Sequence, residues 1–121
     1  MKPRYGLPRC HRLRKTREFD AVRAGGVRAV RGCLIVNWMR LPLGTACRLG
    51  VVVSRKVGGA VVRSRTRRLL REAFRRHQHD FKEPVAVVLV ARPSIHGKNG
   101  RDVERDFLAA MSASQLLRGA G

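Results

Sequence analysis

The sequence RLGVVVSRKVGGAVVRSRTRRLLREAFRRHQH, residues 48–79, runs from an apolar segment through a glycine-containing loop into a long basic segment. Residues 48–54 predict a strand because they centre on consecutive valines, and residues 55–59 predict a loop. Residues 60–79 predict a helix, because their apolar side chains recur at helical spacing. The run VAVVLV, residues 85–90, predicts a second strand that is covered on both faces.

The predicted helix has one apolar side and one basic side. The apolar side consists of Val62, Thr66, Leu69, Leu70, Ala73 and Phe74. The other side carries a single acid, Glu72, among Arg65, Arg67, Arg68, Arg71, Arg75 and Arg76. Like charges one turn apart destabilise a helix by about 0.2–0.5 kcal/mol per pair. A surface that binds a polyanion therefore explains this side better than an ordinary solvated face does.

The composition of the chain indicates the same kind of partner. Its 121 residues include 27 Lys and Arg against 8 Asp and Glu, a formal net charge of +19, and 44% are apolar. Such an excess is typical of nucleic-acid binding. No apolar run approaches the roughly 20 residues that a spanning helix needs, and the basic start lacks the apolar stretch of a secretory signal. We expect one cytoplasmic domain, residues 1–121, with no membrane partner.

The flanking segments complete the predicted order. Residues 1–12 look like a flexible basic arm, and Thr16 can cap a helix that stops at Gly25-Gly26. Residues 33–39 predict a strand that can pair with the strand at 48–54 as a hairpin. Asp102 is expected to cap a closing helix that extends to Leu117. The predicted order is a helix, two strands, a helix, a strand and a helix, and this order implies one sheet with helices packed on it.

The sequence offers no converged catalytic or metal-binding group. The cysteines Cys10, Cys33 and Cys47 are widely spaced, which favours reduced thiols over disulfides or a zinc site. Protein nucleases need carboxylates that hold metal ions, or a histidine pair for acid and base. The close histidines, His77 and His79, would not face each other on a helix. Surface charges and helix caps, with Glu72 held in ion pairs by the arginines around it, account better for the eight acids, which are Glu18, Asp20, Glu72, Asp80, Glu83, Asp102, Glu104 and Asp106.

Residues 63–72, RSRTRRLLRE, resemble the signature of bacterial ribonuclease P proteins. That signature reads Arg-Asn-Arg, one variable residue, Lys-Arg, two further residues, then Arg and an acid or amide. The preceding GVVVSRKVGGAVV, residues 50–62, is similar to the family's lead-in. The likeness extends from about Leu13 to Leu117. Ser64 stands where the family usually has Asn, and Arg67 stands where it usually has Lys.

This resemblance implies a fold and a partner. The fold would be an α/β (α+β) two-layer sandwich like a ribosomal-protein domain, in the order α-β-β(-β)-α-β-α. A rare left-handed βαβ crossover would pass through the basic helix. The resemblance also implies a catalytic RNA subunit as partner and precursor tRNA as substrate. The cleavage chemistry and its Mg²⁺ would belong to the RNA, without a small-molecule cofactor or a catalytic residue in the protein.

The resemblance also assigns two sets of site residues. The contact with the catalytic RNA falls on Arg63, Ser64, Arg65, Arg67, Arg68 and Arg71. The cleft for the single-stranded 5′ leader of the tRNA precursor falls on Phe19, Asn37 and Lys56. The family often has further aromatic residues in this cleft, at places where this chain has Arg23 and Asn37.

Three other functions fit parts of the pattern. A ribosomal or ribosome-assembly protein would have the same charge and fold class. A DNA-binding helix is less suitable, because recognition helices mix arginine with Asn, Gln, Ser and Thr for base edges. A self-sufficient nuclease would need the catalytic groups that the sequence does not bring together.

Overall fold

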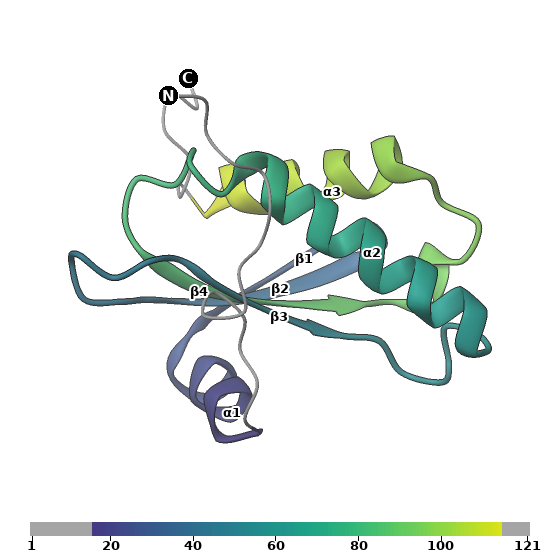
Figure 1. Cartoon of the computed structure of the whole chain (residues 1–121), viewed down its shortest axis with the longest axis horizontal. Helices are drawn as coiled ribbons and strands as arrows, with labels where there is room; N and C mark the ends of the chain where they lie inside the picture. Colours follow the sequence, from purple (N-terminus) through teal and green to yellow (C-terminus); the bar gives the residue numbers. More distant parts are fainter. Residues whose placement is uncertain (1–15, 115–121) are drawn as a thin grey trace.

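Four strands form one mixed sheet with three α-helices packed on it in the computed structural model, which describes residues 16–114 (Figure 1). The expected arm and Leu117 lie outside the described residues. Along the chain the elements are α1 (Thr16–Gly25), β1 (Val27–Arg31), β2 (Leu34–Arg40), β3 (Arg48–Val52), α2 (Ala60–His77), β4 (Val85–Ala91), the short 3₁₀ helix η2 (Pro93–Ile95) and α3 (Gly100–Ala113). The predicted α+β class is confirmed. No helix within residues 16–114 is long and apolar enough to cross a membrane.

The order of the strands in the sheet is β1-β2-β4-β3. β1 and β2 are antiparallel, and β2 pairs antiparallel with the whole length of β4. β3 runs parallel to β4. Parallel neighbours need a crossover connection, and α2 provides it between β3 and β4, while the handedness of this crossover stays a prediction.

The predicted hairpin between the strands at 33–39 and 48–54 is wrong. β4 lies between β2 and β3, where its buried backbone N–H and C=O groups find a partner strand on each edge while its apolar side chains are covered on both faces. β2 forms its hairpin with β1 instead, through the two residues Gly32 and Cys33. β1 is the optional extra strand of the expected order.

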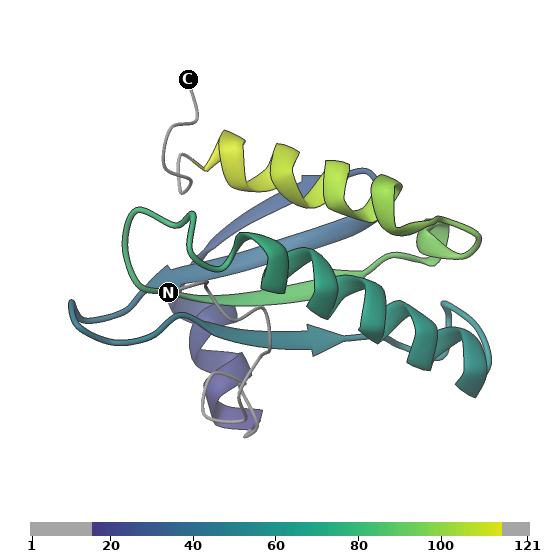
Figure 2. The same ribbon diagram turned by 45° about the horizontal axis from the view of Figure 1, so that its top comes forward.

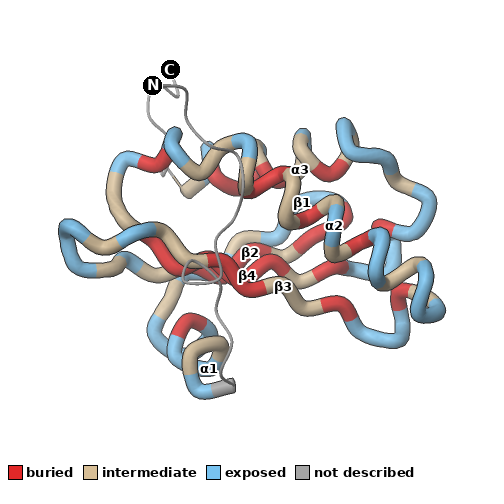
Figure 3. The backbone as a smooth tube through the Cα atoms, viewed as in Figure 1, coloured by how far each residue is buried: buried red, intermediate tan, exposed pale blue. Residues whose placement is uncertain are grey.

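Helices cover the two faces of the sheet unequally. α2 and α3 lie side by side over one face (Figure 2), where they enclose the larger core together with residues such as Leu34, Val87 and Phe107. Of the helices within residues 16–114, only α1 lies on the other face (Figure 1), over a small cluster of Val22, Ala86 and Val88. The central strands β2 and β4 are the most continuously buried part of the backbone (Figure 3).

Helix α3 begins earlier than its sequence pattern predicts. Its N-cap is Asn99, whose Oδ1 accepts a hydrogen bond from the Asp102 backbone N–H at 3.0 Å. The Asp102 carboxylate accepts the Asn99 backbone N–H at 3.3 Å in return. The expectation that Asp102 is the cap is therefore wrong, because the two residues form a reciprocal capping box with Asp102 at the third helical position.

Asp106 of α3 holds the turn between β1 and β2. Its Oδ2 accepts the backbone N–H of Cys33 at 3.0 Å. Gly32 has a positive φ of 53°, and a Cβ at this position would collide with the Asp106 carboxylate. Burial raises the pKa of Asp106, but the hydrogen bonds from Cys33 and the charges of Arg105 and Lys98 outweigh it, so that the pKa is lowered.

This hydrogen bond predicts a pH-dependent contribution to stability. Replacing Asp106→Asn should lower the free energy of unfolding at neutral pH by about 1–2 kcal/mol, as for bonds to charged groups. A carboxylate whose pKa is lowered by folding stabilises the native state above its unfolded pKa of about 3.9 and loses this effect as the pH falls. Chemical unfolding between pH 7 and pH 2 should show the parent and the variant converging in acid.

The exposed Asp20, replaced by Asn, is the matched control for this experiment. The free energy of unfolding of the Asp20→Asn variant should equal that of the parent at every pH between 7 and 2. Parallel curves for the parent and the Asp106 variant down to pH 2 would contradict the assigned role of the carboxylate.

Candidate nucleic-acid interface

Helix α2 turns its basic side to solvent, as the sequence predicts. On the opposite side Thr66, Leu70, Ala73 and Phe74 are buried, and Val62 and Leu69 pack against the same core. Burial of this apolar stripe fixes the rotation of the helix about its axis. Arg65, Arg68 and Arg76 are consequently exposed.

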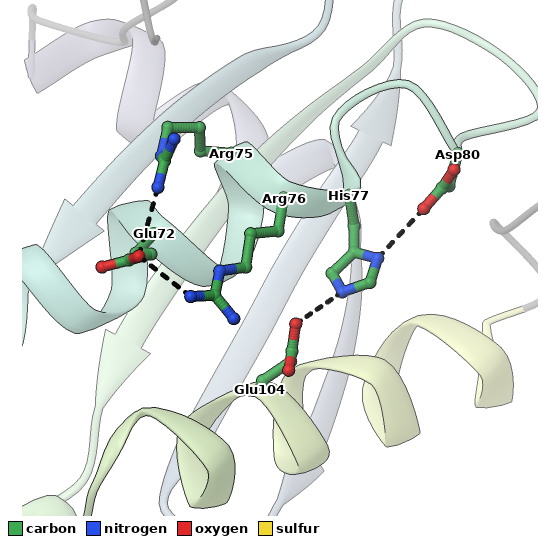
Figure 4. A network of polar contacts seen from close by, with 6 residues as sticks. All are labelled: Glu72, Arg75, Arg76, His77, Asp80 and Glu104. Atoms are coloured by element: carbon green, nitrogen blue, oxygen red, sulfur yellow. Dashed lines mark hydrogen bonds and ion pairs between the residues drawn. The ribbon is translucent and has the colours of Figure 1, made fainter. Parts of the chain in front are cut away.

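Most of the positive charge on this side is not neutralised within the protein. Glu72 is the acidic residue on this side of α2. Its Oε1 accepts hydrogen bonds from Nη2 of Arg75 at 3.1 Å and from Nη2 of Arg76 at 3.2 Å (Figure 4). The predicted capture of Glu72 in ion pairs is thus confirmed. Three further arginines form no ion pair with a described residue, namely Arg65, Arg67 and Arg68.

The first turn of α2 adds to this positive potential. The N-cap Gly59 offers no side-chain acceptor, and the first turn contains no acid. The backbone N–H groups at the positive end of the helix dipole therefore have no anionic partner on the helix itself. A shallow hollow of about 460 Å³ opens beside this turn, lined by Ala60, Val61, Ser64, Arg65 and Arg68. Val61 is 84% exposed there, so that an apolar side chain stands among hydrogen-bond donors.

The six residues of the predicted RNA contact do not form one uniform surface. Ser64, Arg65 and Arg68 line the hollow. Arg63, Arg67 and Arg71 are partly buried on the flank of the helix. The Nε of Arg63 is buried and has no hydrogen-bond partner among the described residues. The structure thus separates an outward group of three from a flanking group of three.

His77 ties the end of α2 to two other segments. Its Nδ1 lies 3.0 Å from Oδ2 of Asp80, and its Nε2 lies 2.9 Å from Oε2 of Glu104 on α3 (Figure 4). Both contacts are hydrogen bonds at the same time only when both ring nitrogens carry protons. His79 is exposed. The imidazole of His77 therefore has a structural role in joining α2 to α3.

Of the three predicted leader-cleft residues, Phe19 and Asn37 lie on the α1 side of the sheet, and Lys56 is not grouped with them. Phe19 of α1 is partly buried and packs against the small cluster that contains Val22 and Val88. Asn37 of β2 is 9% exposed. Lys56 is exposed in the loop before α2 and belongs neither to this cluster nor to the hollow around Asn37.

The hollow around Asn37 measures about 310 Å³. Arg23, Arg28, Ile35 and Val90 line it together with Asn37. Arg28 is the functional candidate that the sequence patterns missed, because β1 was not singled out as a strand. The signal that could have found it is the short Gly32-Cys33 connection between two strand-like runs, which is typical of a two-residue hairpin.

The other groups with possible chemistry have structural partners. Asp102 belongs to the capping box of α3 with Asn99, Glu104 contacts His77, and Glu83 pairs with Arg40 at 3.1 Å. Within residues 16–114, no three or more histidine, cysteine or acidic side chains are grouped to hold a metal ion. Cys33 and Cys47 are free thiols. Burial, with Asp106 nearby, raises the pKa of Cys33 to about 12, which makes it a poor nucleophile.

Comparison with known proteins gives a consistent result. Residues 7–114 match the family described as Ribonuclease P. The ribonuclease P protein component of Brevibacillus brevis is 33% identical over 114 residues, covering 94% of this chain and 90% of that protein. The ribonuclease P protein component of Desulfovibrio desulfuricans is 42% identical over 115 residues, covering 94% of this chain and 83% of that protein. The solved RNase P protein of Staphylococcus aureus has the same fold, with a TM-score of 0.80 at 20% identity over 89% of this chain and 98% of that one.

The family match spans the described residues, and two relatives above 30% identity cover nearly the whole sequence. The arginine signature on α2 lies inside the matched range and on the solvent side of the fold. The chain therefore belongs to the ribonuclease P protein family.

Proposed function

We propose that this chain, as the protein component of the endoribonuclease ribonuclease P, binds the catalytic RNA through α2 and the 5′ leader of precursor tRNA on the α1 side. Both contacts would support endonucleolytic removal of the leader, which gives the mature 5′ end of the tRNA. The observation that carries the proposal is the unneutralised arginine side of α2 in a chain with a net charge of +19. Family membership favours this function over a ribosomal or assembly protein.

The outward group on α2 is suited to an RNA backbone. Each guanidinium can donate two parallel hydrogen bonds to phosphate oxygens. Arg65 and Arg68 have no competing carboxylate among the described residues. Mutual repulsion of these arginines is relieved when phosphates lie between them, so binding RNA stabilises a surface that is unfavourable alone. We assign Arg63, Arg67 and Arg71 to the edge of the same contact.

We assign catalysis to the RNA subunit, with Mg²⁺ held by the RNA. Apart from the exposed Asp20, the carboxylates within residues 16–114 are engaged in the capping box of α3, in ion pairs, in the contacts with His77 or in the hydrogen bond with Cys33. The role of the protein is then to neutralise repulsion between RNA strands and to hold the leader. One domain over residues 1–121, with a flexible arm at 1–12 and a cytoplasmic location, stays a prediction.

A reconstitution tests the proposed function directly. Adding the chain to a bacterial ribonuclease P RNA at low magnesium should accelerate maturation of precursor tRNA, because protein cations take over part of the screening of the RNA backbones. The RNA-free chain should cleave nothing. Processing by highly purified protein without RNA would refute this division of roles, and an RNA that gains no activity from the chain would refute the proposal.

The charge of the α2 surface should appear in the salt dependence of binding. The double replacement Arg65→Ala and Arg68→Ala should weaken binding to the catalytic RNA and reduce the slope of log K against log salt by about one to two units. The exposed pair Lys82→Ala and Arg101→Ala removes the same charge elsewhere and serves as the control. Equal slopes for the two double variants would mean that Arg65 and Arg68 do not contact phosphate.

The leader cleft is tested at Phe19. If its ring stacks on a leader base, Phe19→Ala should cost about 1–3 kcal/mol in binding of precursor tRNA and nothing in binding of mature tRNA. Phe19→Leu keeps an apolar side chain on the cluster of Val22 and Val88 but removes the aromatic face, and thermal melts report folding of both variants. If Phe19→Leu binds precursor tRNA like the parent, the ring serves only for packing.

A further inference from the structure

Two arginines are fastened to the turn between β1 and β2. Nη1 of Arg31 donates a hydrogen bond to the carbonyl oxygen of Val30 at 2.7 Å, and Nη1 of Arg92 donates one to the carbonyl oxygen of Gly32 at 3.0 Å. Each bond uses one of the five N–H donors of a guanidinium. Both side chains are exposed, and neither forms an ion pair with a described residue. The turn therefore presents two held cations whose charge is not neutralised within residues 16–114.

The acids beside this turn are already engaged. Asp106 accepts the backbone N–H of Cys33 at 3.0 Å. Arg105 contacts Asp106 at 3.7 Å and Asp102 at 3.5 Å. The charge of Lys98 also acts on the Asp106 carboxylate. Together with the two held arginines, these side chains give the turn more positive than negative charge.

The shape of the turn does not require the charge of the two arginines. The bond from Cys33 to Asp106 fixes it to α3, and the backbone N–H of Arg92 donates to the carbonyl oxygen of Cys33 at 2.9 Å. Gly32 supplies the positive φ of 53° that a two-residue hairpin connection favours. A carbonyl oxygen needs a donor but not a charge, and cations that are close together repel one another unless an anion lies between them. A purely structural role therefore leaves the two charges unexplained.

Held guanidinium groups are well suited to phosphate. The planar fork of arginine can donate two parallel hydrogen bonds to phosphate oxygens. A free surface side chain loses rotamer freedom when it binds, and this loss weakens the complex. The bonds of Arg31 and Arg92 to the turn have already restricted these two side chains. The turn is thus organised in advance for the backbone of a nucleic acid.

The turn lies at the same end of the sheet as the first turn of α2. Leu34 at the start of β2 pairs with Ala91 at the end of β4, and Val52 at the end of β3 pairs with Val90. α2 begins at Ala60, shortly after β3, so that its first turn lies at this end too (Figure 1). Neighbouring strands lie about 4.8 Å apart, which places the turn roughly 10–15 Å from the end of β3, with β4 between them. One RNA molecule can reach both places.

We propose that Arg31 and Arg92 form a second contact with the backbone of the catalytic RNA, separate from the contact of the α2 arginines. This inference rests on the proposed function, since the RNA that α2 is proposed to bind is the partner. Phosphate contacts fix the orientation of a protein on a nucleic acid. One row of arginines along a helix leaves rotation about that row open, and a second contact to one side of the row removes this freedom. The turn thereby sets how the sheet, and with it the α1 side, is oriented on the RNA.

The first experiment is a hydroxyl-radical footprint of a bacterial ribonuclease P RNA with the full chain bound. The parent protein should protect two separate groups of nucleotides. Arg65→Ala with Arg68→Ala should expose one group, and Arg31→Gln with Arg92→Gln should expose only the other. If every nucleotide that the parent protects is exposed by the α2 variant, there is no second contact.

The second experiment measures the salt dependence of binding to the same RNA without tRNA. The glutamine variant of Arg31 and Arg92 should lower the slope of log K against log salt by about one to two units. Arg31→Lys with Arg92→Lys keeps both charges and should restore the slope of the parent. Arg17→Gln with Lys82→Gln is the matched control, because it removes two exposed charges from α1 and from the segment before β4. This control should keep the slope of the parent.

The outcomes separate the inference from the proposed function. If the glutamine variant keeps the slope or the footprint of the parent, the two arginines only hold the turn, and the inference is overturned while the contact of α2 stands. A lysine variant as defective as the glutamine variant has the same meaning. If thermal melts show that the glutamine variant is unfolded, the group of nucleotides that stays protected in the α2 variant supports the inference, and its absence overturns it. If the parent does not bind the RNA at all, the proposed function itself fails.

Discussion

Burial of β4 on both faces and both edges is the constraint on which the rest of the structure depends. Six of its seven residues are buried. An apolar strand of this kind is stable only with a neighbour on each side and helices above and below. β2 and β3 supply the edges, α2 and α3 cover one face, and α1 covers part of the other. The positions of all three helices follow from the demands of this one strand.

The same constraint separates the arginine side of α2 from the α1 side of the sheet, two surfaces proposed to bind RNA. α2 can bury its apolar stripe against the sheet only by turning its arginines away from it, which leaves them on the outside of the fold. α1 is too short to cover its face completely, and the uncovered part contains the hollow around Asn37. The contacts between His77, Asp80 and Glu104 fix α2 to its neighbours. The two surfaces are thus held in one geometry by a rigid sheet.

Local patterns predicted the features of the fold that depend on local physics. The two sides of α2 followed from helical periodicity, and the cover on both faces of β4 followed from its uninterrupted apolar run. Pairing of strands depends on contacts between distant segments, so the hairpin expected between the strands at 33–39 and 48–54 was wrong. The cap of α3 was missed because the mutual bonding of Asn99 and Asp102 depends on geometry more than on residue type. At the site, Arg28 could not be recognised without its position opposite Asn37.

The central place of β4 also governs when the protein can fold during its synthesis. β2 and β3 precede it in the sequence, yet each finds its principal partner only in β4, and Leu34 pairs with Ala91. Until the ribosome has released residues 85–91, the apolar stripe of α2 has no complete sheet to cover. Between the synthesis of His77 and that of Ala91, the nascent chain therefore has a strongly cationic helix whose apolar stripe lacks the central strand of its sheet. Folding of this sheet is a late and cooperative event, completed only when the last strand inserts between two waiting edges.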